Sequence, residues 1–149
     1  MDDSTWSTAE LHLPSDTEAG KRAVDELLVR LQEYDWLEND IFGVHLAVEE
    51  AIVNAIKHGN QYDDRKRVHF RYQVCQDRVL IEICDEGDGF DPFRVPDPTD
   101  EANLETPSGR GIMLMRNFMS RVEYNETGNR VVMEKFRNGC NGQAGRTVG

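Results

Sequence analysis

Apolar and polar residues alternate along several short stretches of the chain and recur at helical spacing along others. The segment "AELHLPS" (9–15) alternates, which predicts a short edge strand. Ser15 or Asp16 can cap a helix, and apolar residues at helical spacing carry that helix to about Tyr34. A second periodic stretch predicts another helix over about 39–58.

The second half of the chain is richer in alternating segments. Two strands are expected at about 67–75 and 78–84, joined by a tight turn near Gln76 and Asp77. Residues 85–108 contain four of the five prolines and predict a long loop, which in a compact domain is usually functional or disordered. A helix over about 110–120 is followed by a hairpin that turns around Thr127–Gly128–Asn129.

The order of these elements indicates the fold class. Strand, helix, helix, two strands, loop, helix and two strands lack the strand–helix alternation of a parallel sheet. We therefore expect an α+β two-layer sandwich, in which helices pack on one face of a mixed, mostly antiparallel sheet. One domain is expected over residues 8–136, with flexible termini at 1–7 and 137–149.

Composition and charge narrow the function. The 149 residues are 38% hydrophobic and 30% charged, as in globular proteins, and the net charge of −11 argues against direct nucleic-acid binding. An apolar run long enough to span a membrane, a signal peptide and a CxxC motif are all missing from the sequence, and the three cysteines are typical of reduced thiols. These features predict a cytoplasmic protein that does not contact a membrane.

The excess of acid is concentrated in residues 85–105, which contain eight acidic side chains and one base, Arg94. A solvated loop, a lid over a ligand and a docking surface for a basic partner all fit this composition.

The segment "AVEEAIVNAIKHGN" (47–60) places Glu50 and Asn54 one helical turn apart, about 5–6 Å at Cβ. Asn54 could offer an amide oxygen to Mg²⁺, and Glu50 could accept a proton from a hydroxyl held near a phosphate. A solvated polar pair explains the same spacing. His58 and Gly59 are interpreted as the helix end, with Gly59 in the left-handed conformation.

The segment "ICDEGDGFDP" (83–92) runs from a predicted strand into Asp85, Gly87 and Gly89. Glycines let a backbone come close to a flat ring, and an ionised carboxylate at the strand end can accept hydrogen bonds from an amino group such as that of adenine. A plain acidic turn is the alternative, and the spacing excludes an EF-hand loop.

In "SGRGIMLM" (108–115), Gly109 and Gly111 flank Arg110 where a helix is expected to begin. Free N–H groups at a helix N-terminus make an anion site, although a flexible hinge also fits, and the spacing matches neither a P-loop nor a Rossmann motif.

Together, in this order, the three motifs resemble the GHKL ATP-binding family. Within it, "HLAVEEAIVNAIKHGN", "DEGDGFDP" and "SGRGIMLMRNFM" are most similar to the anti-sigma factor serine/threonine kinases of bacterial partner-switching systems. The sequence departs from the family's usual G-x-G-L motif at Ile112, where leucine is common.

The resemblance implies a role for each matching residue. Glu50 would be the general base, Asn54 the Mg²⁺ ligand and Asp85 the acceptor for the adenine amino group. Gly87 and Gly89 would shape the pocket for the adenine base. The phosphates of ATP would be bound by Gly109, Arg110 and Gly111, and residues 93–108 would close over the nucleotide as a lid.

The implied reaction transfers the γ-phosphate of ATP to a Ser or Thr of an anti-anti-sigma (STAS-domain) protein, while a sigma factor is the expected second partner. Such relatives commonly form homodimers, although the sequence contains no exposed apolar stripe that requires one. Two alternatives stay open: a regulatory module that binds ATP without transferring phosphate, and an enzyme that only hydrolyses ATP.

Overall fold

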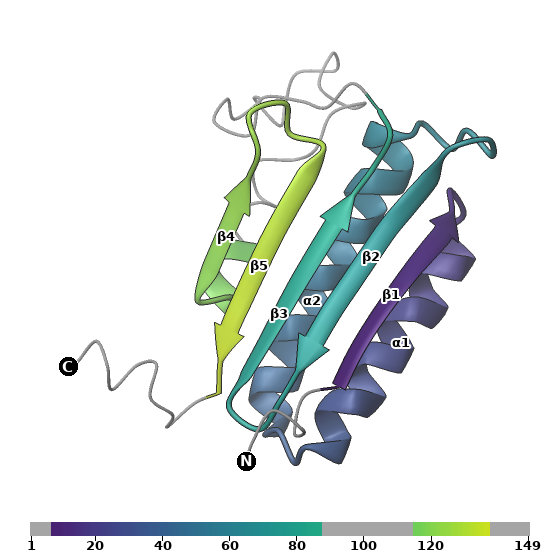
Figure 1. Cartoon of the computed structure of the whole chain (residues 1–149). Helices are drawn as coiled ribbons and strands as arrows, with labels where there is room; N and C mark the ends of the chain where they lie inside the picture. The colour runs from purple at the N-terminus through teal and green to yellow at the C-terminus, as the bar shows by residue number, and fades with distance from the viewer. Residues whose placement is uncertain (1–6, 88–114, 138–149) are drawn as a thin grey trace.

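The computed structural model describes residues 7–87 and 115–137, which form a sheet with helices on one side (Figure 1). Five strands lie in the order β1-β2-β3-β5-β4, and every pairing between them is antiparallel. The strands are β1 (Ser7–Pro14), β2 (Arg67–Val74), β3 (Arg78–Cys84), β4 (Arg121–Tyr124) and β5 (Arg130–Phe136). The predicted two-layer sandwich is therefore confirmed.

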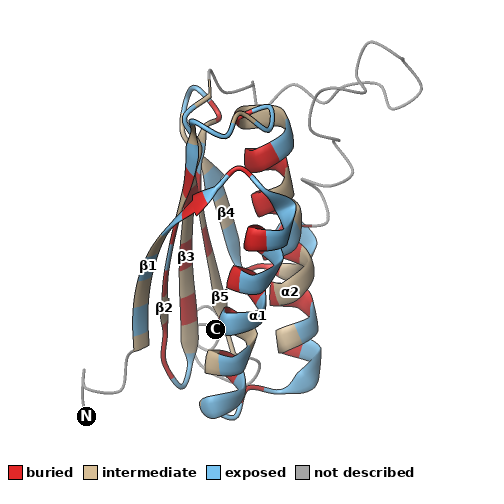
Figure 2. Cartoon of the chain, turned by 90° about the vertical axis from the view of Figure 1, so that its right-hand side faces the viewer, coloured by how far each residue is buried: buried red, intermediate tan, exposed pale blue. Residues whose placement is uncertain are grey.

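Two helices cover the same face of the sheet, as Figure 2 shows from the side. Helix α1 (Thr17–Glu33) begins at Asp16, whose carboxylate accepts a hydrogen bond from the backbone N–H of Glu18 at 3.0 Å. Of the two predicted caps, Asp16 is therefore the one used. Helix α2 (Glu38–Val53) continues into η2 (Asn54–Gly59), a single wider turn of π-helix.

The core lies between these two layers. Side chains that alternate along β2 and β3 point to the helices, and α1 and α2 contribute apolar residues at helical spacing. The largest fully buried side chains include Leu27, Ile52, Phe70, Tyr72 and Ile81. None of the described helices is long and apolar enough to cross a bilayer.

The predicted turns are also confirmed. Cys75 donates its backbone N–H to the carbonyl of Arg78 across the Gln76–Asp77 turn, and Gly128 lies in the β4–β5 turn with a φ of 79°. A left-handed backbone at that position explains why a glycine occurs there. Residues 88–108 of the predicted loop and 110–114 of the predicted helix lie outside the described residues, while 115–118 of that predicted helix are helical.

One prediction about the second helix is wrong. Gly59 does not adopt a left-handed conformation; the positive φ angles belong instead to Gln61 and Tyr62, at 52° and 59°. The helix ends through the π-turn, and the chain reverses two residues later than the glycine suggested. Glycine is needed at position 59 because the backbone there packs closely against Asp85.

Candidate functional site

Four segments meet at one end of the sheet. The end of η2, the end of β3, the start of β2 and the β4–β5 turn all lie at the upper end of Figure 1. A small pocket of about 20 Å³ lies between three of these segments. Its lining comes from α2 and η2 (Ala51, Asn54, Ala55, Gly59), from the end of β3 (Ile83, Asp85) and from the hairpin (Tyr124, Gly128, Asn129, Arg130, Val131).

Asn54 is the polar side chain on the helical wall of the pocket. It is only 7% exposed, and its amide nitrogen has no hydrogen-bond partner among the described residues. A buried amide without a partner costs free energy, so a polar ligand in this pocket would relieve that cost. Half a turn of the last side-chain bond would present the amide oxygen instead, which is the donor that a hard cation prefers.

Asp85 forms the opposite wall, directly after β3. Its backbone N–H donates to the carbonyl of Asn129 at 2.9 Å, and its carboxylate accepts a hydrogen bond from the N–H of Gly87 at 2.8 Å. Burial raises the pKa of the Asp85 carboxyl to about 6, although the Gly87 hydrogen bond and the charge of Lys66 oppose that rise. A carboxyl that is half-buried and ionised near neutral pH is well suited to accept hydrogen bonds from a ligand.

Gly59 explains how the two walls come so close. A Cβ atom built on Gly59 would lie 2.3 Å from the Asp85 carboxyl carbon, far inside the van der Waals limit. A Cβ on Gly87 would likewise lie 1.8 Å from the carbonyl oxygen of Gly59. Position 59 therefore needs glycine because of close tertiary packing, and not because of its backbone angles.

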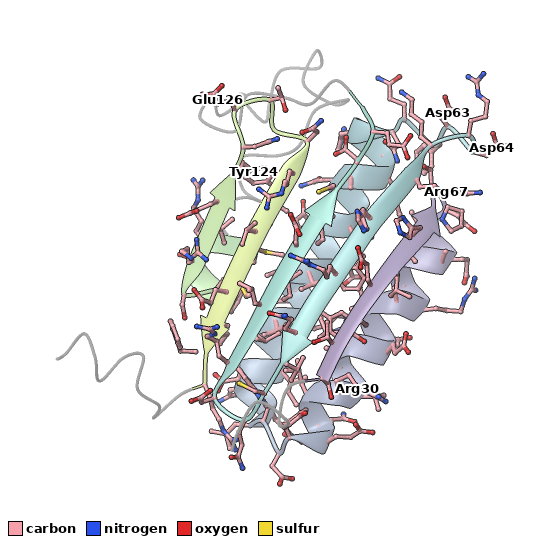
Figure 3. The ribbon with its side chains drawn as sticks, viewed as in Figure 1. Arg30, Asp63, Asp64, Arg67, Tyr124 and Glu126 are labelled. Carbon is pink, nitrogen blue, oxygen red and sulfur yellow. The ribbon has the colours of Figure 1, made fainter. Side chains whose placement is uncertain are left out.

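Tyr124, which is labelled on β4 in Figure 3, lines the third side of the pocket. Burial is the main cause that raises the pKa of its hydroxyl far above the ordinary value of 10, and the negative charge of Glu50 raises it further. The neighbouring Asn54 side chain opposes this rise without cancelling it. The phenol therefore stays neutral, and its hydroxyl donates a hydrogen bond to the sulfur of Met115 at 4.0 Å.

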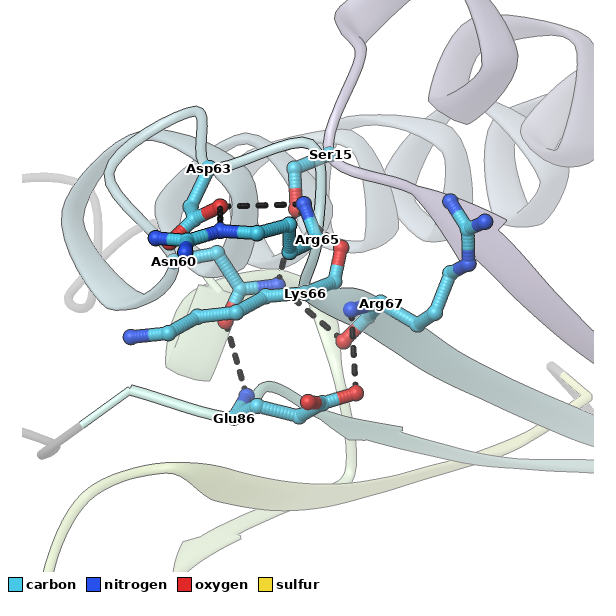
Figure 4. Close-up of polar contacts among 7 residues, drawn as sticks. All are labelled: Ser15, Asn60, Asp63, Arg65, Lys66, Arg67 and Glu86. Atoms are coloured by element: carbon cyan, nitrogen blue, oxygen red, sulfur yellow. Dashed lines mark hydrogen bonds and ion pairs between the residues drawn. The ribbon is translucent and has the colours of Figure 1, made fainter.

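A buried hydrogen-bond network holds the end of η2 against the end of β3 (Figure 4). The Asn60 amide, which is fully buried, donates to the Ser15 hydroxyl and to the Arg67 carbonyl, both at 3.0 Å. Its oxygen accepts a hydrogen bond from the backbone N–H of Glu86 at 2.7 Å. The network continues through Glu86, whose carboxylate accepts from the backbone N–H of Arg67, and through Ser15, which donates to the carbonyl of Lys66. Asn60 thus fixes the chain next to Asp85.

The structure brings together some of the sequence-predicted residues. Asn54 and Asp85 line the same pocket, and Gly87 donates to Asp85 beside it. Glu50 lies one turn before Asn54, half-buried, and it is not among the pocket-lining residues. The predicted Gly89, Gly109, Arg110, Gly111 and lid segment 93–108 lie outside the described residues.

Glu49 points elsewhere, as its position on the helix predicts. It lines a separate groove between α1 and α2, with Lys21 and Val53, and its carboxylate lies 3.5 Å from the imidazole of His45. The two adjacent glutamates therefore face different parts of the molecule.

Sequence reasoning missed two contributors to the pocket, Tyr124 and the hairpin tip. The sequence "YNETGNR" predicts the turn, but its local pattern contains no signal that Gly128 and Asn129 face a ligand pocket. Asn60 was missed as well, because a buried asparagine two residues after a predicted helix cannot be distinguished from a loop asparagine by periodicity.

Comparison with known proteins shows which family contains this chain. The model of the family described as "histidine kinase-like ATPase domain" matches residues 13–135. The chain belongs to this family. The pocket between the asparagine of α2–η2 and the aspartate after β3 is therefore a site within a histidine kinase-like ATPase domain.

Individual proteins with similar sequences show which members of this ATPase family the chain resembles. An anti-sigma F factor of Clostridium perfringens is 34% identical over 105 residues, which cover 66% of this chain and 74% of that protein. The serine-protein kinase RsbW of Bacillus subtilis is 32% identical over 116 residues, which cover 71% of this chain and 68% of that protein.

Among solved structures, the RsbU and RsbW domains of Rv1364c from Mycobacterium tuberculosis share the fold, with a TM-score of 0.60 at 14% identity. The match covers 88% of this chain but only 32% of that much longer chain.

Proposed function

We propose that this protein is an anti-sigma factor serine/threonine-protein kinase of the cytoplasm. It would bind ATP with Mg²⁺ and phosphorylate a Ser or Thr of an anti-anti-sigma STAS-domain protein, thereby controlling the sequestration of a sigma factor. The similarity to anti-sigma F factors and to RsbW kinases supports this class. The observation that carries the proposal is the convergence of Asn54, Asp85 and Tyr124 on one pocket.

The pocket residues fit a nucleotide and its cation. The Asp85 carboxylate would accept a hydrogen bond from the amino group of adenine. The close packing of Gly59 against Asp85 keeps this part of the pocket narrow. The Asn54 amide, buried and without a partner for its nitrogen, would turn its oxygen to Mg²⁺. Bound Mg²⁺ would neutralise charge on the transferring phosphoryl group.

Glu50 would act on the partner's hydroxyl. Its carboxylate would take the hydroxyl proton while the oxygen forms a bond to the γ-phosphorus and the bond from that phosphorus to the bridging oxygen of ADP breaks. For the phosphate end of the site, the roles of Gly89, Gly109, Arg110 and Gly111 stay predictions from the family resemblance.

Phosphorylation would then change which partner is bound. It adds roughly −1.5 to −2 charges to the STAS protein. Because this chain carries a net charge of −11, the added negative charge would weaken the complex and release the phosphorylated product.

Substitution of Glu50 tests the kinase assignment. We expect Glu50→Gln to bind ATP nearly as well as the unaltered chain but to lose transfer of labelled phosphate to a STAS-domain protein encoded nearby. Glu49→Gln is the matched control, since Glu49 faces the α1–α2 groove and should transfer phosphate normally. Full transfer by Glu50→Gln would remove Glu50 from the role of general base.

One observation favours the second candidate function, a regulatory module that binds ATP without transferring phosphate: Glu50 is not among the residues that line the pocket. Such a module would show ATP-dependent affinity for a partner and no phosphoprotein. Steady release of free phosphate without any partner would instead identify an enzyme that only hydrolyses ATP.

A further inference from the structure

The face of the sheet that the helices leave uncovered carries a cluster of three potential metal-binding side chains. His12 of β1 lies directly opposite His69 of β2 in the strand register, and their rings stack with centroids 4.3 Å apart. Glu10, two residues before His12 on the same face, brings its carboxylate to 2.8 Å from Nε2 of His69. One ligand atom from each of the three residues lies within 4.8 Å of the other two.

We propose that Glu10, His12 and His69 form a binding site for a divalent transition-metal ion, with Zn²⁺ as the expected occupant. Two imidazoles and one carboxylate are a donor set that zinc accepts in proteins, with a water molecule completing the tetrahedron. No other group of this kind occurs in the part of the chain that the structure describes.

The geometry is close to what such an ion requires. Zinc–ligand bonds of about 2.0–2.2 Å in a tetrahedron put the donor atoms roughly 3.3 Å apart. From separations of up to 4.8 Å the donors need to approach by at most about 1.5 Å. The stacked imidazoles must also turn so that one nitrogen of each ring faces the ion, and side-chain rotations allow this because Glu10 and His12 are exposed and His69 is half-buried. The β1–β2 pairing already holds the backbone in position, which reduces the cost of assembling the site.

The neighbouring charges leave Glu10 available to this cluster. Arg71 is opposite Glu10 in the register, but its guanidinium pairs with Glu82 at 3.1 Å instead. His69 pairs with His12 of β1 on one side and with Cys84 of β3 on the other, so a thiol lies next in the row of side chains across the sheet. The Cys84 sulfur is, however, not part of the group of described residues whose ligand atoms lie within 4.8 Å of one another. We therefore assign the ion to the two imidazoles and the carboxylate.

This site differs from the nucleotide pocket in position and in chemistry. It lies on the outer face of the sheet, whereas Asn54 and Asp85 lie in the pocket formed with the helices. Magnesium prefers oxygen donors in an octahedron and keeps its waters, so this imidazole-rich cluster selects against it. A bound zinc ion would tie the edge strand β1 to β2 and thereby stabilise the folded chain.

Zinc titration of the full chain tests the site. After the protein is stripped with a chelator, kept reduced and freed of nucleotide, we expect calorimetry with ZnCl₂ to show one saturable zinc per chain. His12→Ala and His69→Ala should each weaken zinc binding by about tenfold or more, and Glu10→Gln should weaken it less. Zinc should also raise the thermal unfolding midpoint of the unaltered chain but not that of the histidine variants.

Matched controls separate this site from other donors. His45→Ala removes an exposed imidazole that lies 3.5 Å from Glu49, and it should leave zinc binding unchanged, as should Cys84→Ser and Asp85→Asn. If a histidine variant does not fold by circular dichroism, His12→Gln replaces it. Three results would overturn the proposal. These are the absence of saturable zinc uptake by the unaltered chain, uptake by the His12 and His69 variants equal to that of the unaltered chain, and loss of uptake in Cys84→Ser or His45→Ala. Asp85→Asn alters the nucleotide pocket and leaves the zinc ligands in place. Zinc uptake therefore tests the zinc site and phosphate transfer tests the kinase proposal, so that either can fail without the other.

Discussion

At the scale of single residues, Asp85 has the most perturbed environment in the candidate site. Its pKa of about 6 lies above the ordinary value of 3.8 because the carboxyl is buried. The folded chain therefore retains a proton that the unfolded chain releases between about pH 4 and 6. The stability that this group contributes is complete below pH 4 and is lost as the pH rises through 6.

Substitution of Asp85 should consequently increase stability while it removes function. We expect Asp85→Asn to be more stable than the unaltered chain at pH 8, where the carboxylate is charged, and the difference to shrink at pH 5. The amide oxygen can still accept the Gly87 N–H, so the local turn should persist. Urea unfolding of both proteins at the two pH values measures this. A variant that is less stable at pH 8 would contradict the burial argument.

Gly59 gives a second prediction at this scale. Gly59→Ala would place a methyl group 2.3 Å from the Asp85 carboxyl carbon, so one of the two segments must move. We expect a loss of about 1–3 kcal/mol in the free energy of unfolding and a marked loss of ATP affinity. Gly43→Ala is the control, because its added carbon would contact Phe118 at 3.2 Å, away from the pocket-lining residues, and should leave ATP affinity unchanged.

At the scale of elements, the site depends on how the end of η2 is joined to the end of β3. Each hydrogen bond of a π-turn spans one more residue than that of an α-helix, and such turns often occur at functional positions. Here it begins at Asn54, and Asn60 follows it with three hydrogen bonds to other segments. The join is therefore polar and buried, which makes it sensitive to loss of a single partner.

Removal of the Asn60 side chain tests this join. Asn60→Ala leaves the Glu86 N–H and the Arg67 carbonyl without their partner, and we expect a loss of about 2–4 kcal/mol in the free energy of unfolding. Asn39→Ala, at an exposed position in the first turn of α2, should change stability by less than about 0.5 kcal/mol. Denaturant unfolding compares the two, and similar losses would show that the network contributes little.

At the scale of the whole molecule, ligand binding and folding stability are linked. A nucleotide that binds only the folded chain at 100 times its dissociation constant stabilises it by about 2.7 kcal/mol. The predicted phosphate contacts of Gly109, Arg110 and Gly111 lie within 88–114, outside the described residues, and stay predictions.

We expect ATP to raise the thermal unfolding midpoint by several degrees in the presence of Mg²⁺ and by less in the presence of a chelator. In Asn54→Ala the magnesium-dependent part of this increase should disappear, because the amide oxygen is lost, while a smaller increase from the nucleotide itself remains. Differential scanning fluorimetry measures all four conditions. An undiminished magnesium effect in the variant would exclude Asn54 as the metal ligand.

The sequence by itself determined the elements and their faces. Periodicity is a local property, so the strands over 67–75 and 78–84, the turn at Gln76–Asp77 and the two-layer fold followed from the order of apolar and polar residues. The motifs likewise pointed to Asn54 and Asp85, and these two side chains line one pocket in the folded chain.

Tertiary structure alone decided the rest. Gly59 is required by its contact with Asp85, Tyr124 closes the pocket from a strand some seventy residues after Asn54, and His12 meets His69 through the strand register. Each of these features joins residues that are distant in the chain, and the pattern around any one of them contains no information about its partner. Close packing and strand register are set by the whole fold, which is why local periodicity could not reveal them.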